Sequence, residues 1–212
     1  MAAKKEDDLV LLSKIVAVIV STFFMLFAFY IYYKYEKRYN IRNADIRVYD
    51  SKQFMAYIVK VGGCGIIFLL CLFSIAGAII KNELTFAYLY IIPIIIISFI
   101  GAFSLAGKIA VTYIGVLIYK NKNLIVIPGD THNNSITENI FKLKYMFDAA
   151  SMEELPISGV QKITRESGKK VFIHGSFGTR CVEWLDKQKR DECIAALERV
   201  AGRKLSSFDM GQ

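Results

Sequence analysis

Three long apolar runs occupy the first half of the chain: Ile15–Tyr33, Val61–Ile80 and Leu84–Leu105. A helix needs about 20 apolar residues, each adding about 1.5 Å, to cross the hydrocarbon core of a bilayer. The runs therefore predict three transmembrane helices, at about residues 9–33, 55–80 and 84–106. Whatever the rest of the chain forms must be attached to this membrane-embedded region.

Composition separates the chain into two parts. Of its 212 residues 54% are hydrophobic, and these residues are concentrated before Gly107. We expect residues 1–107 to form the transmembrane region and residues 108–204 to form one globular domain, followed by a short tail at 205–212. A segment of about 100 residues is the usual size of a single domain.

The distribution of charge predicts the orientation. The formal net charge is +8, and the loop at 34–54 between the first two predicted spans is rich in Lys and Arg. Short basic loops remain in the cytoplasm, so three crossings place the N-terminus outside and the C-terminal domain in the cytoplasm of a bacterial inner membrane. Lys4, Lys5 and Lys14 favour the reverse orientation, which remains the alternative.

The same charges argue against two classes of function. Basic residues beside apolar spans are explained by topology and by contact with anionic lipid, so we expect no nucleic-acid partner. No Asp, Glu, Arg or His lies deep in a predicted span. This pattern disfavours a proton relay, an ion pathway or a transporter of charged substrates.

Small residues recur along the second and third predicted spans, where they would let helices approach closely. The pattern is compatible with packing inside one chain and with oligomer contacts. The candidate helix-packing residues are Gly62, Gly63, Gly65, Ser74, Ala78, Ser98, Ala102 and Ala106.

After Gly107 the pattern becomes that of a β domain closed by a helix. Ala149–Glu154 is typical of a turn or short helical piece, and Asn139–Phe147 alternates like a strand, although a short helix remains possible. A C-terminal helix should begin after Asp186, a good N-cap, and end at Gly202. The other predicted strands are Val111–Lys120, Asn123–Pro128, Leu155–Arg165, Lys170–His174 and Thr179–Leu185.

The segment Leu155–His174, followed by Val182-Glu-Trp-Leu185 and the closing helix, resembles bacterial pleckstrin-homology-like (PH-like) domains attached to membrane hairpins. The resemblance covers about 111–202 and is most specific over 155–200. The insertion-like segment 129–152 and the additional first span depart from the family pattern. The resemblance implies an α+β PH-like barrel with a C-terminal helix.

PH-like folds often present basic side chains to phosphate head groups from a hairpin. The corresponding candidates for binding an anion or a partner are Lys162, Arg165, Lys169 and Lys170. A solvated basic edge that discourages strand pairing is the competing interpretation.

Residues that could carry chemistry are sparse. Gly168-Lys169-Lys170 lacks the spacing of a phosphate-binding loop. His174 and Cys181 could meet across a hairpin, but a nucleophile pair also needs an orienting group. We therefore expect no catalytic, cofactor-binding or metal-binding residues.

The sequence as a whole predicts a non-enzymatic membrane scaffold or assembly subunit that presents a cytoplasmic interaction domain. Its expected partners are the lipid bilayer and either further copies of itself or other subunits of a membrane complex, with no small-molecule substrate identified. The alternatives are a module that responds to anionic lipid and a membrane-bound enzyme of unknown reaction.

Overall fold

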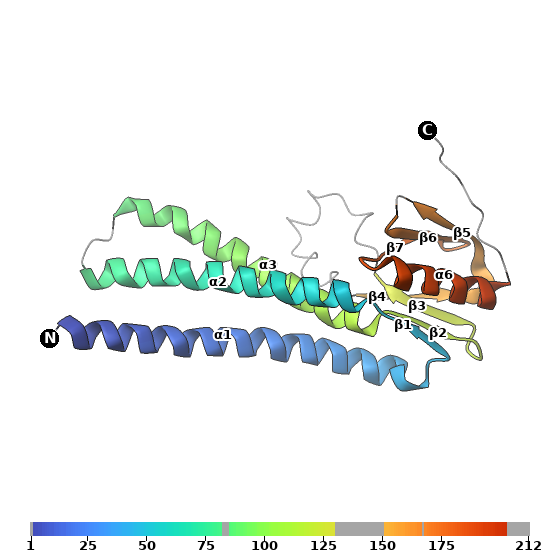
Figure 1. Ribbon diagram of the computed structural model, residues 1–212, viewed down its shortest axis with the longest axis horizontal. Helices are drawn as coiled ribbons and strands as arrows, with labels where there is room; N and C mark the ends of the chain where they lie inside the picture. The colour runs from blue at the N-terminus through green and yellow to red at the C-terminus, as the bar shows by residue number, and fades with distance from the viewer. Residues whose placement is uncertain (1, 82–84, 130–150, 167, 203–212) are drawn as a thin grey trace.

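The computed structural model describes residues 2–81, 85–129, 151–166 and 168–202. Three long helices lie side by side and a β domain lies at one end of them (Figure 1). The helices are α1 (Ala2–Tyr39), α2 (Ser51–Lys81) and α3 (Ile91–Ile114). The start of α1 and the ends of α2 and α3 that connect to each other lie away from the β domain (Figure 1).

Within the described residues, three helical segments are long and apolar enough to cross a membrane: Lys14–Tyr39, Ser51–Ile79 and Ile91–Ile114. The prediction of three apolar helices is confirmed at this level. The segments contain 26, 29 and 24 residues. At about 1.5 Å per residue each exceeds the roughly 30 Å of a hydrocarbon core.

The third helix lies further along the chain than the predicted span at 84–106. A 3₁₀ turn at Phe86–Tyr90 precedes it, and Pro93 falls in its first turn. Proline is tolerated there because the backbone N–H it lacks would have no partner in the helix. Pro93 therefore does not interrupt α3.

The predicted strand at Val111–Lys120 is wrong over its first four residues, which continue α3 to Ile114. Val111 and Ile114 are buried against the end of α1 and the adjoining sheet, so tertiary packing overrides their β propensity. The strand β2 (Val116–Tyr119) begins only after Gly115.

The predicted loop at 34–54 also contains structure. Helix α1 continues to Tyr39, a 3₁₀ turn covers Ile41–Asn43, and β1 (Ile46–Val48) pairs antiparallel with β2. The β domain therefore takes its first strand from before α2. The α2–α3 hairpin is inserted between two neighbouring strands of one sheet.

Two antiparallel sheets form the domain. The first has the order β1-β2-β3-β4, with β3 at Leu124–Pro128 and β4 at Met152–Pro156. The second has the order β5-β6-β7, formed by Val160–Glu166, Lys170–Gly175 and Gly178–Glu183. The described strands leave the two sheets unclosed.

Several predicted elements need correction in this region. Residues 152–154, predicted as a turn or short helical piece, belong to β4. The strand predicted at Leu155–Arg165 is divided by a 3₁₀ turn at Ile157–Gly159. The strands predicted at Asn123–Pro128, Lys170–His174 and Thr179–Leu185 correspond to β3, β6 and β7. The strand predicted at Asn139–Phe147 lies outside the described residues.

The C-terminal helix α6 (Lys187–Ala201) has the predicted ends. The Asp186 carboxylate accepts a hydrogen bond from the Gln188 amide, and Gly202 adopts a left-handed conformation with φ of 65°. The apolar face of α6 packs on the domain core, where Trp184, Cys193 and Leu197 are buried together.

Strand β2 is buried along its whole length because it packs on both sides. Val116 and Ile118 face the core between the sheets and α6, whereas Leu117 and Tyr119 pack with the ends of α1 and α3. The Tyr119 hydroxyl donates a hydrogen bond of 2.6 Å to the Tyr39 carbonyl oxygen. The first sheet thus lies between the helical bundle and the domain core, which joins the two parts closely.

Candidate functional site at the helix–sheet junction

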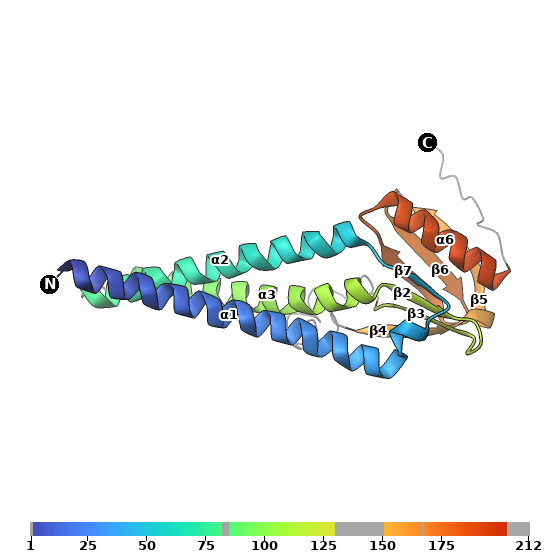
Figure 2. The ribbon, with the colours of Figure 1, turned by 60° about the horizontal axis from the view of Figure 1, so that its bottom comes forward.

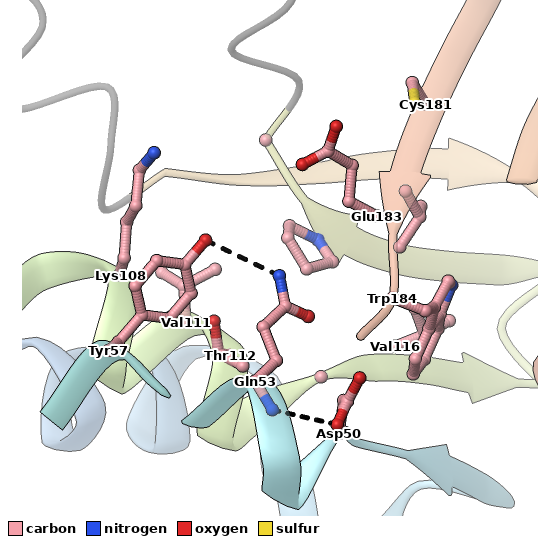
Figure 3. Close-up of a pocket in the computed structure, with 14 residues that line it drawn as sticks. Asp50, Gln53, Tyr57, Lys108, Val111, Thr112, Val116, Cys181, Glu183 and Trp184 are labelled. Carbon is pink, nitrogen blue, oxygen red and sulfur yellow. Dashed lines mark hydrogen bonds between the residues drawn. The ribbon is translucent and has the colours of Figure 1, made fainter. Parts of the chain in front are cut away.

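The candidate site is a small cavity at the junction where α2 and α3 meet the β domain (Figure 3). Its volume is about 120 Å³. Residues from both helices and from the ends of β2, β3 and β7 line it. The cavity is therefore assembled from segments that are far apart in the sequence.

Asp50 is the central polar residue of this junction, and it is only 2% exposed. One carboxylate oxygen accepts a 3.0 Å hydrogen bond from the Gln53 amide at the start of α2. The other accepts bonds from the amides of Leu185 and Asp186, at 2.6 and 2.7 Å. A single buried carboxylate thus caps α2 and holds the segment that leads into α6.

A second contact links the same two helix starts. Lys52 in the first turn of α2 forms a 2.9 Å ion pair with Asp186, the N-cap of α6. The Lys52 ammonium and the hydrogen bond from the Gln188 amide lower the pKa of Asp186 below its usual value. Asp50 and Asp186 therefore each interact with the starts of both α2 and α6. These contacts attach α2 to the β domain.

The remaining polar groups of the cavity come mainly from the helices. The Gln53 side-chain amide donates a 3.5 Å hydrogen bond to the Tyr57 hydroxyl, and the Lys108 ammonium lies 6.0 Å from the centre of the Tyr57 ring (Figure 3). Glu183 and Thr112 complete the polar lining. This set can hold a small polar group by hydrogen bonds.

The structure places the candidate pair His174 and Cys181 on different rungs of the β6–β7 ladder. Both nitrogens of His174 contact threonine hydroxyls, with 2.8 Å to Thr164 and 2.9 Å to Thr179. The register places Cys181 opposite Phe172, not opposite His174. Among the residues that the structure describes, no group of three or more His, Cys, Asp or Glu side chains could hold a metal ion.

The cysteine thiols are not paired in disulfides. Cys193 lies on the buried face of α6, and burial raises the pKa of its thiol to about 12. A thiol with this pKa stays protonated at neutral pH and is a poor nucleophile.

The four candidate basic residues of the β5–β6 hairpin are not gathered into one patch. Lys162 and Lys170 share the outward face, where Lys170 forms a 3.4 Å ion pair with Glu183. Arg165 belongs to the opposite face in register and lies 3.9 Å from Asp191 on α6. Lys169 is exposed in the turn between the strands.

The turn of this hairpin nevertheless lies near the junction. The Lys169 carbonyl oxygen accepts a 2.9 Å hydrogen bond from the Trp184 amide, and Trp184 lines the junction cavity. The buried guanidinium of Arg190 donates to the Gly168 carbonyl oxygen, which ties the turn to α6. Lys169 and Lys170 are therefore on the side of the domain that adjoins the start of α2.

The candidate helix-packing residues fall into two groups. Ala78, Ser98, Ala102 and Ala106 are buried, and the last two pack with Phe24 and Ala28 of α1. Ser74 is exposed. A methyl group added at Gly62, Gly63 or Gly65 would meet no atom within 4 Å, so these glycines make no close helix contact within the chain.

Asp50 was missed as a functional candidate in the sequence. A signal was present, because Asp50 and Gln53 have the spacing of a capping box just before a long apolar helix. No local pattern indicates that the same carboxylate also binds a segment 135 residues away.

No family model matches the chain, and neither a curated protein nor a solved structure matches it.

Proposed function

We propose that the protein is a non-enzymatic membrane scaffold, or assembly subunit, that presents its β domain as an interaction module within an oligomeric or larger membrane complex. The observation that carries this proposal is the insertion of the α2–α3 hairpin between β1 and β2. Together with Asp50 and the buried β2, it makes the domain continuous with the membrane helices. Such a rigid connection suits a subunit that holds its β domain in a fixed position for a partner to bind.

The PH-like character of the domain is part of the proposal. A four-stranded sheet, a three-stranded sheet and a C-terminal helix over their shared core support it. Under this proposal the first strand is supplied by the segment before α2, and residues 152–156 supply the fourth.

The proposed orientation follows from charge and from the arrangement of the helices. The start of α1 and the β domain lie at opposite ends of the bundle (Figure 1). Helices that cross the bilayer would thus place them on opposite faces. The basic segment between α1 and α2 favours a cytoplasmic β domain and an external N-terminus, in the inner membrane of a bacterium.

Native mass spectrometry of the full chain, extracted in a mild detergent, tests the scaffold role. We expect particles that contain more than one chain or a reproducible second protein. A particle that stays monomeric and free of partners at all protein concentrations, and also after extraction with native lipids, would contradict the proposal.

A second candidate function, a response to anionic lipid, is favoured by the position of Lys169 and Lys170 near the start of α2. The full chain should be tested in nanodiscs of phosphatidylglycerol and of phosphatidylcholine, because residues 108–204 alone lack β1. Hydrogen exchange in the β5–β6 turn should slow in the anionic lipid.

Two variants make this test specific. Reversing Lys169 and Lys170 to Glu should remove the lipid-dependent slowing, whereas Lys122→Glu, which changes an exposed lysine in the β2–β3 turn, should keep it. Equal exchange in the two lipids for the unaltered chain would exclude this function.

A further inference from the structure

A groove runs along the helical bundle between α1 and α2. Figure 2 shows these two helices separating toward the β domain, with α3 between them. Two cavities of about 640 and 410 Å³ lie along this path. They share Ser21, Met25, Ala28 and Ile109, so they form one continuous depression.

The groove is lined mainly by apolar side chains of three segments that are apolar enough to cross a membrane. Its walls come from α1 and α2, and Ala106, Ile109 and Ala110 of α3 form its floor. Met25 at its edge is 70% exposed. In a bilayer, hydrocarbon surrounds such a groove, and either a lipid chain or another helix must fill it.

The dimensions favour a lipid chain. A helix with its side chains is about 10 Å across with a pitch of 5.4 Å, so each turn occupies roughly 400 Å³. The larger cavity, about 640 Å³, therefore holds between one and two turns, which is a small fraction of a spanning helix. An unbranched acyl chain is narrower and can follow the groove through both cavities.

A cation lies at the end of the groove near the β domain. The ring of Tyr113, which lines the groove, is 5.0 Å from the guanidinium of Arg47, and Tyr49 stacks on the same group at 5.0 Å. Arg47 donates hydrogen bonds to the carbonyl oxygens of Tyr113 and Ile114. These bonds use two of the five N–H donors of a guanidinium.

Two neighbouring cations have acidic partners, whereas Arg47 contacts Tyr113 of the groove. Arg42 forms a 3.4 Å ion pair with Glu36, and Lys52 forms one with Asp186. Guanidinium groups bind phosphate with matched, charge-assisted hydrogen bonds. Basic pockets between transmembrane helices at the cytoplasmic surface are suited to anionic head groups.

We propose that the groove between α1 and α2 binds one acyl chain of an anionic phospholipid, whose phosphate group contacts Arg47. The site depends on the helices lying in a membrane and not on the scaffold role. Failure of one proposal therefore leaves the other intact.

Native mass spectrometry of the delipidated full chain, with added dioleoyl-phosphatidylglycerol or dioleoyl-phosphatidylcholine, tests the site. Because the two probes carry identical chains, their difference reports the head group. We expect one retained lipid per chain and about tenfold tighter binding of phosphatidylglycerol, because the choline ammonium of phosphatidylcholine offsets the phosphate charge that Arg47 contacts.

Two substitutions distinguish the contribution of the acyl chain to binding from that of the head group. Ser21→Phe fills the groove and should weaken both lipids at least tenfold, whereas Ser74→Phe, the same change at an exposed position of α2, should bind both as the unaltered chain does. Arg47→Gln should equalise the two lipids. If Ser21→Phe fails to fold by circular dichroism, Ser21→Leu provides the smaller obstruction.

Three results would overturn the proposal. The first is unchanged lipid retention in the folded Ser21 variant. The second is equal binding of the two lipids by the unaltered protein, or a preference for phosphatidylglycerol that persists in Arg47→Gln. The third is a dimer that the Ser21 variant dissociates, which would assign the groove to a second copy of the chain.

Discussion

At the scale of single residues, Asp50 joins helix α2 to the β domain. Its buried carboxylate accepts three backbone hydrogen bonds, one from α2 and two from the segment before α6. Buried charge is costly unless it is fully hydrogen-bonded. A carboxylate at this position therefore fixes the geometry of the segments that surround it.

Asp50→Ala should destabilise the protein by about 3 kcal/mol, because it removes a helix cap and leaves two backbone donors without partners. The melting temperature should fall by about 10 °C. The emission of Trp184, the only tryptophan and a lining residue of the junction, reports the transition.

Asp45→Ala is the matched control, since the exposed Asp45 carboxylate accepts one hydrogen bond from the Lys120 amide. Its cost should stay below about 1 kcal/mol. Equal melting temperatures for the two variants would show that Asp50 does not hold the junction.

His174 supplies a prediction about pH. Burial and the nearby Lys162 ammonium lower the pKa of its imidazole below the usual 6.5. The folded state therefore favours neutral His174, so its contribution to stability is complete above about pH 6.5 and is lost as the pH falls toward the lowered pKa.

Lys162→Gln should raise the pKa of His174 toward 6.5, and an NMR titration of the imidazole measures it. Arg165→Gln removes a charge from the same strand on the opposite face and should leave that pKa unchanged. An unchanged His174 pKa in Lys162→Gln would show that the two side chains do not interact.

At the scale of elements, the sequence predicted those helices and strands whose ends depend on residues close in the chain. The spans, the β5–β7 hairpins and both ends of α6 follow from apolar runs, glycine turns and caps. Strand β1 could not be found in this way, because its three residues pair with a segment about 70 positions away.

Strand β4 was not predicted, because its acidic residues are unusual in a strand. Glu153 and Glu154 give it the composition of a turn, but they form ion pairs with Arg180 at 2.5 Å and Arg38 at 2.7 Å. The sequence predicted the hairpin that carries the basic candidates, whereas the junction depends on contacts between residues far apart in the chain.

Gly115 lies at the point where α3 becomes β2 and should tolerate no side chain. Its φ of 73° and ψ of −151° are accessible essentially to glycine alone, and an added Cβ would lie 2.7 Å from the Cβ of Tyr49. Gly115→Ala should therefore cost about 2–4 kcal/mol, measured by thermal unfolding.

Gly63→Ala is the control, because a Cβ there meets no atom within 4 Å. It should leave stability unchanged or raise it by up to about 1 kcal/mol. Comparable losses for the two variants would contradict the geometry at the α3–β2 connection.

The divided β domain leads to another prediction for an element. Residues 108–204 expressed alone should fail to fold, because β2 loses β1, one of its two partner strands, and the core loses Val48. Fusing residues 44–50 to this segment through a flexible linker supplies the missing strand and should restore a dispersed amide NMR spectrum. Proper folding of 108–204 without the added strand would show that β1 is dispensable.

At the scale of the whole molecule, the scaffold proposal depends on one arrangement. Under this proposal three helices cross the bilayer, with the N-terminus on one face and the β domain and the segment between α1 and α2 on the other. Packing of β2 between the bundle and the domain core makes the two parts one body. The membrane region then serves as a support for the domain.

Labelling from one side of the membrane tests this arrangement most directly. In a cysteine-free background, single cysteines replace Ala2, Arg42 and Lys122, and a membrane-impermeant maleimide is added to intact bacterial spheroplasts. We expect Ala2→Cys to react at once, and Arg42→Cys and Lys122→Cys to react only after permeabilisation. Labelling of Ala2→Cys and Arg42→Cys from the same side, or of Lys122→Cys in intact cells, would contradict the arrangement.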